Sequence, residues 1–120
     1  MQKYPKAIGP YSVYREANGL LFVSGQLAID PDTGELVGEN VKEQTRRALE
    51  NVKAVLDENG LNWDNVVKTT CFLADINDFS DFNKIYAEFF TTPYPARSAF
   101  AVKDLPKGAR VEIEIIAAKQ

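Results

Sequence analysis

Short segments of mostly apolar and aromatic residues, separated by turn signals, predict extended structure at the start of the chain. Residues 11–17 and 20–24 are rich in Tyr, Val and Leu, and they flank Asn18-Gly19, a favoured two-residue turn of a β-hairpin. Residues 26–29 predict a third short strand after Gly25, a glycine that indicates either a bulge or the close approach of another group to the backbone. We therefore expect strands before any helix begins.

Two later segments repeat apolar residues with the spacing of amphipathic helices. The first follows Asn40, which with Glu43 resembles a helix capping box, and it ends before Gly60. The second follows a cap at Asn77 or Asp78, and prolines end it. Its expected buried stripe consists of Phe79, Phe82, Ile85, Tyr86, Phe89 and Phe90.

The remaining apolar segments predict three more strands. Residues 66–74 are apolar and β-branched with little alternation, as in a central strand that is buried on both faces. Residues 97–102 and 111–118 are expected to be the last two strands. The order predicts one α+β domain over residues 1–120, in which six strands form a sheet and both helices cover one of its faces.

The last predicted strand is apolar on both of its faces near its end. Ile116 and Ala118 point away from the side that carries its other apolar residues, namely Val111, Ile113, Ile115 and Ala117. Because no third helix is predicted to cover that second face, we expect another copy of the chain to do so.

Composition narrows the chemistry further. The 120 residues include no histidine and one cysteine, so Ser-His-Asp and Cys-His catalysis are excluded, and a metal site is not expected. The lone Cys71 fits a reducing compartment and is expected to be a buried, inert thiol. Any acid–base chemistry has to come from Asp, Glu, Lys, Tyr or water.

Charge and hydropathy argue against nucleic-acid and membrane partners. The chain has 14 Lys and Arg against 17 Asp and Glu, a formal net charge of −3, whereas nucleic-acid phosphates favour basic surfaces. No apolar run approaches the roughly 20 residues of a membrane-spanning helix, and residues 1–5 lack the apolar segment of a secretory signal. We expect a cytoplasmic protein.

Arg97 is the first candidate for binding chemistry. It begins a strand of small and apolar residues, in which Ser98 and Ala99 leave room for a ligand. A guanidinium group binds a carboxylate through two parallel hydrogen bonds. The residue is therefore either a strand-edge arginine with a solvated head group or an anion receptor.

Glu112 and Glu114 lie on the same side of the last predicted strand, about 6–7 Å apart. They are either two surface carboxylates or, because Ile116 continues their side, groups close to a covered apolar surface. In the second case burial would raise the pKa of a carboxyl group and make it suitable for proton transfer.

Other candidates are neutral. Tyr11 either packs at the strand start or orients a ligand through its hydroxyl group, and Asn83 is either a rim residue or a polar ligand contact. Gly25 would let a ligand reach backbone groups. Ser24 is not expected to act as a nucleophile, since the chain has no histidine to activate it.

Seven short motifs together resemble the RidA family, also called the YjgF family, over roughly residues 8–118. They are Ile8-Gly9-Pro10-Tyr11-Ser12, Ser24-Gly25-Gln26, Asn51-Val52-Lys53, Val67-Lys68-Thr69-Thr70, Pro95-Ala96-Arg97-Ser98, Leu105-Pro106-Lys107-Gly108 and Val111-Glu112-Ile113-Glu114. The resemblance implies a chorismate-mutase-like α+β fold with a mixed sheet, and a homotrimer with ligand clefts between its subunits. It also implies a deaminase that hydrolyses 2-iminobutanoate and 2-iminopropanoate.

The same resemblance implies roles for individual residues. Arg97 would bind the substrate carboxylate and Glu112 would position or activate water, without cofactor or metal. The remaining substrate-binding residues would be Tyr11, Ser24, Gly25 and Asn83. Family members often carry a cysteine two residues after this arginine, but here the residue is Ala99, so no thiol role is expected.

One alternative is a regulatory protein that binds small carboxylates without catalysis. The acidic pI near 5.0 argues against ribonuclease activity. The motif block that contains Arg97 and Glu112 argues against a chorismate mutase. The sequence leaves open whether these two residues meet within one chain or across two.

Overall fold

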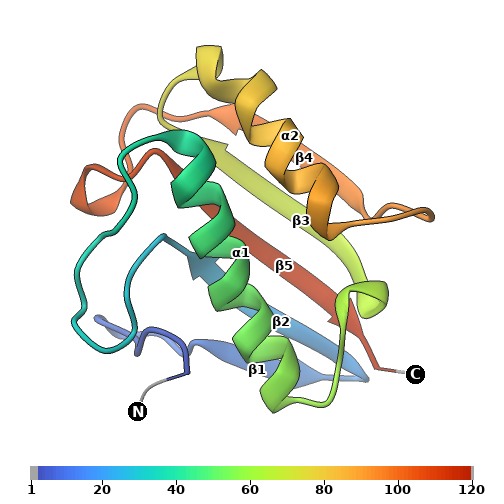
Figure 1. Ribbon diagram of the computed structural model, residues 1–120. Helices are drawn as coiled ribbons and strands as arrows, with labels where there is room; N and C mark the ends of the chain where they lie inside the picture. The colour runs from blue at the N-terminus through green and yellow to red at the C-terminus, as the bar shows by residue number, and fades with distance from the viewer. Residues whose placement is uncertain (1–2, 120) are drawn as a thin grey trace.

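The computed structural model describes residues 3–119. Met1 and Gln2, which belong to the segment for which no secretory signal is expected, lie outside the described residues, as does Gln120. The strands are β1 (Tyr14–Ala17), β2 (Leu20–Gln26), β3 (Val66–Leu73), β4 (Ala96–Ala101) and β5 (Val111–Ala118), and the α-helices are α1 (Val41–Glu58) and α2 (Phe79–Phe89). Figure 1 shows both helices on the same face of the sheet.

The sheet has five strands in the order β1-β2-β5-β3-β4, with β3 and β4 parallel and the other neighbours antiparallel. The prediction of six strands is therefore wrong. Gln26 ends β2, and Ile29 makes only an isolated bridge to Leu36. The carbonyl groups of Leu27 and Ile29 accept hydrogen bonds from a side chain of α1, and not from the backbone of a neighbouring strand.

The hairpin at Asn18-Gly19 is confirmed. Both residues have positive φ angles, 52° and 78°, as a type I′ turn requires, and the flanking Ala17 and Leu20 are paired. The first strand begins at Tyr14 and not at Tyr11, so the preceding segment is an arm that crosses the surface.

Helix α1 begins and ends as its sequence predicts. Asn40 Oδ1 accepts a hydrogen bond of 2.9 Å from the Glu43 N–H, and Gly60 follows the helix with a φ of +71°. Only half of the expected capping box forms, because Glu43 Oε1 accepts from the Glu39 N–H and not from that of Asn40. The apolar face of α1 packs over β2 and β5.

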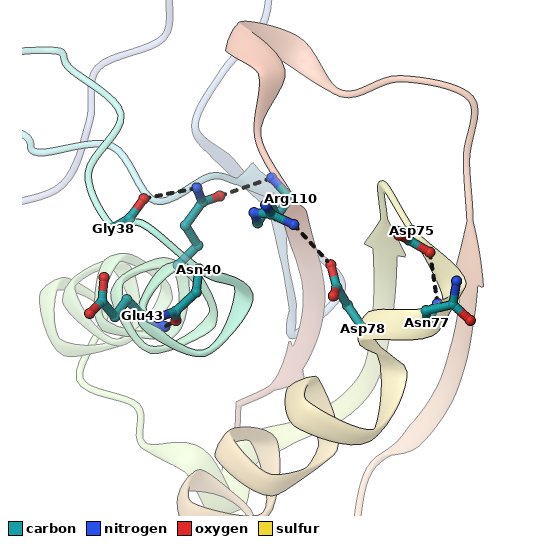
Figure 2. Close-up of polar contacts among 8 residues, drawn as sticks. Gly38, Asn40, Glu43, Asp75, Asn77, Asp78 and Arg110 are labelled. Atoms are coloured by element: carbon teal, nitrogen blue, oxygen red, sulfur yellow. Dashed lines mark hydrogen bonds and ion pairs between the residues drawn. The ribbon is translucent and has the colours of Figure 1, made fainter.

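Helix α2 begins directly after Asp78, one of the two residues predicted to cap it. Asp78 occupies the N-cap position without a side-chain capping bond, and its carboxylate lies 3.4 Å from Arg110 Nη1. The turn before the helix is capped by Asp75, whose Oδ1 accepts from the Asn77 N–H (Figure 2). The helix ends at Phe89, before Pro93.

The two faces of the sheet differ in what covers them. Residues of β5 that point toward the helices are at most 2% exposed, whereas those that point the other way are more accessible. β3 lies between two other strands of the sheet, as predicted. Only its side that faces the helices is fully buried, so the expectation of burial on both faces is wrong for one chain. We call the uncovered side the open face. It carries the apolar side chains Phe22, Phe72, Phe100 and Ile116.

Tyr4 of the N-terminal arm and Tyr14 at the start of β1 both bind the end of α1. The hydroxyl groups of Tyr4 and Tyr14 both donate to Glu58 Oε2 at 2.7 Å. Burial and this bond raise the pKa of Tyr4 to about 12, and the two donors lower the pKa of Glu58. Within residues 3–119, neither helix is long and apolar enough to cross a bilayer.

Candidate functional site

Glu112 lies on the open face, near the beginning of β5, between β2 and β3. Its register partner on β3 is Phe72, and on the β2 side it lies against Gly25. A Cβ atom at position 25 would lie 2.8 Å from Glu112 Cδ and closer still to its Oε2. The β2–β5 register also shifts between Val23 and Gln26, so both the bulge and the close approach expected at Gly25 are confirmed.

The surroundings of Glu112 favour its protonated form. The carboxyl group is half-buried, and burial raises its pKa above the ordinary value of 4.5, with a further contribution from the negative charge of Glu114. A carboxyl group with a raised pKa exchanges protons more readily near neutral pH than an ordinary glutamate does. Glu112 is therefore suited to acid–base chemistry.

A cavity of about 740 Å³ lies against Glu112 and is open to solvent. Three segments form its walls: the N-terminal arm, the loop that follows β2, and the turn before β5. Its principal lining residues are Ile8, Tyr11, Ser24, Gly25, Leu27, Ile29, residues 30–34, Pro106, Lys107, Glu112 and Glu114. Four residues predicted for the site, Tyr11, Ser24, Gly25 and Glu112, thus share one cavity.

Two of these residues also organise the cavity wall. Ser24 Oγ donates a hydrogen bond of 2.6 Å to the carbonyl of Ser12, which ties the arm to β2. The Tyr11 ring lies beside Gly9, and its hydroxyl oxygen is 3.5 Å from the Ile8 N–H. About half of Tyr11 is exposed, so its side chain borders the opening.

Arg97 occupies a different place, at the start of β4. It pairs in register with Thr69, which is fully buried beneath α2, so the Arg97 side chain points to the helix face. Its guanidinium carbon lies 4.8 Å from the centre of the Tyr86 ring and 5.4 Å from that of Phe79. Its Nη1 donates to Asn83 Oδ1 at 2.8 Å. The aromatic rings and the amide orient the guanidinium plane.

Within one chain, Arg97 and Glu112 therefore do not meet. Thr69 pairs with both Arg97 and Ile115, and all three residues point to the helix face. Glu112 is an odd number of residues from Ile115 on the same strand and points to the open face. The chain thus carries two separate groups of candidate residues, one with the carboxyl group and one with the guanidinium group and Asn83.

Two features of these residue groups are not evident from the sequence. Phe79 and Tyr86 were assigned to a core stripe, and their contact with Arg97 follows only from the packing of α2 over β4. The wall formed by residues 27–34 was assigned in part to a strand. By contrast Cys71 is buried as expected, and burial raises the pKa of its thiol to about 11.

Known proteins resemble this chain over nearly its whole length. Residues 1–119 match the family model described as endoribonuclease L-PSP. A human 2-iminobutanoate/2-iminopropanoate deaminase is 47% identical over 115 residues, which cover 96% of this chain and 84% of that protein. The chain belongs to the RidA/YjgF family.

Other members of the RidA/YjgF family carry different names. AldR of Lactococcus lactis, named as a candidate regulator, is 50% identical over 113 residues, which cover 94% of this chain and 90% of that protein. The structure of E. coli TdcF with bound serine is 41% identical with a TM-score of 0.93, and covers 100% of this chain and 96% of that one. Solved structures of related proteins confirm the predicted fold class apart from the number of strands.

The contact between Gly25 and Glu112 generates a first prediction. A methyl group in Gly25→Ala would overlap the Glu112 carboxyl group, so we expect that group to move outward and the variant to lose about 1–3 kcal/mol of stability. Because burial is the main cause of the raised pKa, the pKa of Glu112 should fall toward 4.5. NMR titration of ¹³C-labelled glutamate measures it.

Gly9→Ala is the matched control, since a Cβ atom there would be 3.5 Å from the Tyr11 ring, an ordinary contact. An unchanged pKa of Glu112 in Gly25→Ala would contradict the prediction.

The raised pKa of Glu112 also predicts how stability depends on pH. When a carboxyl group has a higher pKa in the folded than in the unfolded protein, the protein loses stability as the pH rises through the interval between those two pKa values. Glu112→Gln should therefore raise the melting temperature at pH 8, by about 1–3 °C, and the gain should vanish below about pH 4.5. Thermal scans from pH 4 to pH 8 measure the difference.

Glu35→Gln, at an exposed position outside β5, controls for the loss of one negative charge. A gain of equal size at pH 4 and pH 8 would show that the burial of Glu112 is not its cause.

Proposed function

We propose that this protein hydrolyses reactive 2-imino acids and their enamine tautomers to 2-oxo acids and ammonia. The observation that carries the proposal is the half-buried Glu112, whose raised pKa and position against Gly25 present a proton-exchanging group to an open cavity. The human relative named 2-iminobutanoate/2-iminopropanoate deaminase supports these two compounds as substrates.

Arg97 would bind the carboxylate of the substrate. A guanidinium group has five N–H donors in a plane, and the contact with Asn83 uses one nitrogen at one edge. Stacking on Tyr86 holds that plane, so the opposite edge can form two parallel bonds with a carboxylate. The serine bound to the related TdcF also carries a carboxylate group.

The chemistry requires neither a covalent nucleophile nor histidine. A protonated imine carbon is already electrophilic, so water adds to it while Glu112 accepts a proton from that water. Glu112 then returns this proton to the carbinolamine nitrogen. As the C–N bond breaks and ammonia leaves, the hydroxyl group gives its proton to the Glu112 carboxylate and becomes the carbonyl of the 2-oxo acid, and the ammonia takes up that proton as ammonium. Alignment of water and imine supplies the remaining acceleration.

We propose that each complete site is shared by two copies of the chain. Arg97 and Glu112 point to opposite faces of one sheet, so Arg97 of one copy would face the cavity beside Glu112 of the next. The apolar side chains of the open face, such as Phe22 and Phe100, would be buried by the same assembly. A homotrimer with three equivalent clefts satisfies both requirements.

Substitution of Arg97 tests the proposed function. We expect Arg97→Ala to lower kcat/KM for 2-iminobutanoate by at least about 100-fold, and Arg97→Lys to recover little, because an ammonium group cannot form the bidentate contact. A threonine dehydratase generates the imine, and its decay is followed with and without the variant. Arg47→Ala, which removes only a surface ion pair with Glu50, should match the wild type.

If Arg97→Ala hydrolyses freshly generated 2-iminobutanoate as fast as the wild type, the proposal is wrong. Tight binding of 2-oxobutanoate by a wild-type protein that does not accelerate imine decay would instead favour a non-catalytic carboxylate-binding regulator. The name of the related AldR is the observation that favours this second function.

A mixing experiment tests the shared site. Arg97→Ala and Glu112→Gln should each be inactive alone, but co-expressed copies should form some clefts that contain both intact residues. For random assembly, one cleft in about four receives Arg97 from one variant and Glu112 from the other, so activity should recover to about a quarter of the wild-type value. Inactive mixed oligomers, isolated with two different affinity tags, would contradict the shared site.

A further inference from the structure

Asn51 of α1 binds the loop that forms one wall of the cavity. The residue is 2% exposed, and its Nδ2 donates to the carbonyl of Leu27 at 3.0 Å and to that of Ile29 at 2.9 Å. Both acceptors lie just after β2, where the strand pairing has ended. A side-chain amide with two donors therefore replaces the neighbouring strand that would otherwise bind these carbonyls.

Gln44 binds the other end of the same loop. It lies two helical turns before Asn51 on the same side of α1. Its Nε2 donates to the carbonyl of Gly38 at 3.1 Å, and its Oε1 accepts from the Arg110 N–H at 2.9 Å. Figure 2 shows these bonds as dashed lines that end at Gly38 and Arg110. Arg110 immediately precedes β5, so the loop and the strand that carries Glu112 are joined through one helix.

The loop between these two anchors faces the cavity. Leu27, Ile29 and residues 30–34 line it, opposite Glu112. Inside the loop, the Asp30 N–H donates to Glu35 and the Val37 N–H donates to Ala28, so the segment holds together as a unit. Its distance from Glu112 is set by what attaches it to the rest of the fold, and Asn51 supplies two of those attachments.

We infer that Asn51 is a positioning residue that sets the fit of this wall to the side chain of the bound imino acid. The inference rests on the proposed function, and Asn51 itself lies behind the wall, where it binds the backbone of the loop. If Asn51 is truncated, the wall moves while Glu112 and Arg97 keep their own contacts, so substrate binding changes more than the chemical step does.

The first experiment compares two substrates that differ by one methylene group. For Asn51→Ala we expect KM for 2-iminobutanoate to rise about 5- to 20-fold while kcat changes less than about 3-fold. The preference for 2-iminobutanoate over 2-iminopropanoate should fall by up to about fourfold, because the extra methylene group loses its apolar wall. A general loss of folded protein would lower both activities equally and leave this preference unchanged.

Asn59→Ala is the matched control. Asn59 also has a side-chain amide at α1, but it donates to the carbonyl of Val55 in its own helix and not to the loop. We expect wild-type KM values and a wild-type preference. Hydrogen exchange measured on Asn51→Ala should show faster exchange at the Asp30 and Val37 amides, while the amides of β3 and β5 remain protected.

A second variant covers the case in which Asn51→Ala does not fold. Gln44→Met keeps the length of the side chain, removes both of its hydrogen bonds, and should alter the same preference from the other end of the loop. The inference is overturned if folded Asn51→Ala keeps the wild-type preference for 2-iminobutanoate, or if Gln44→Met keeps it when Asn51→Ala does not fold. In that case the activity of the wild-type protein still upholds the proposed function. A wild-type protein without activity overturns both.

Discussion

Successive side chains of a β-strand point to opposite faces, and this alternation determines where chemistry can occur in this protein. On β5 it buries the residues that pack beneath the helices and turns Glu112 toward the open face. On β4 it turns Arg97 toward α2, where the guanidinium group stacks on Tyr86. The same pleat that builds the core therefore separates the two charged groups on which the proposed reaction depends.

The absence of a side chain at position 25 is the second constraint. A carboxyl group can be half-buried beside β2 only because Gly25 leaves its space open and the strand bulges there. Burial raises the pKa of Glu112, which costs stability when the group is ionised. Local instability at a group that exchanges protons is typical of functional sites.

Features encoded by neighbouring residues could be predicted from the sequence. The turn at Asn18-Gly19 and the limits of α1 at Asn40 and Gly60 depend on local backbone preferences, and the structure confirms them. The bulge at Gly25 belongs to the same group. The two carboxylates of β5 were likewise placed on one side of their strand from alternation alone.

Features that depend on distant residues could not be predicted. Residues 27–29 are apolar like those of a buried strand, yet the carbonyl groups of Leu27 and Ile29 bind Asn51, more than twenty residues further along the chain. The separation of Arg97 from Glu112 follows from the order of β5, β3 and β4, which local patterns do not contain. The N-terminal arm is held in a similar non-local way. Tyr4 donates to Glu58, Ser24 Oγ donates to the Ser12 carbonyl, and the Ser24 N–H donates to the Val13 carbonyl. A protease that trimmed this arm would thus remove one side of the cavity and leave the sheet and its helices intact, so a folded protein with a normal circular dichroism spectrum is no guarantee of a complete site.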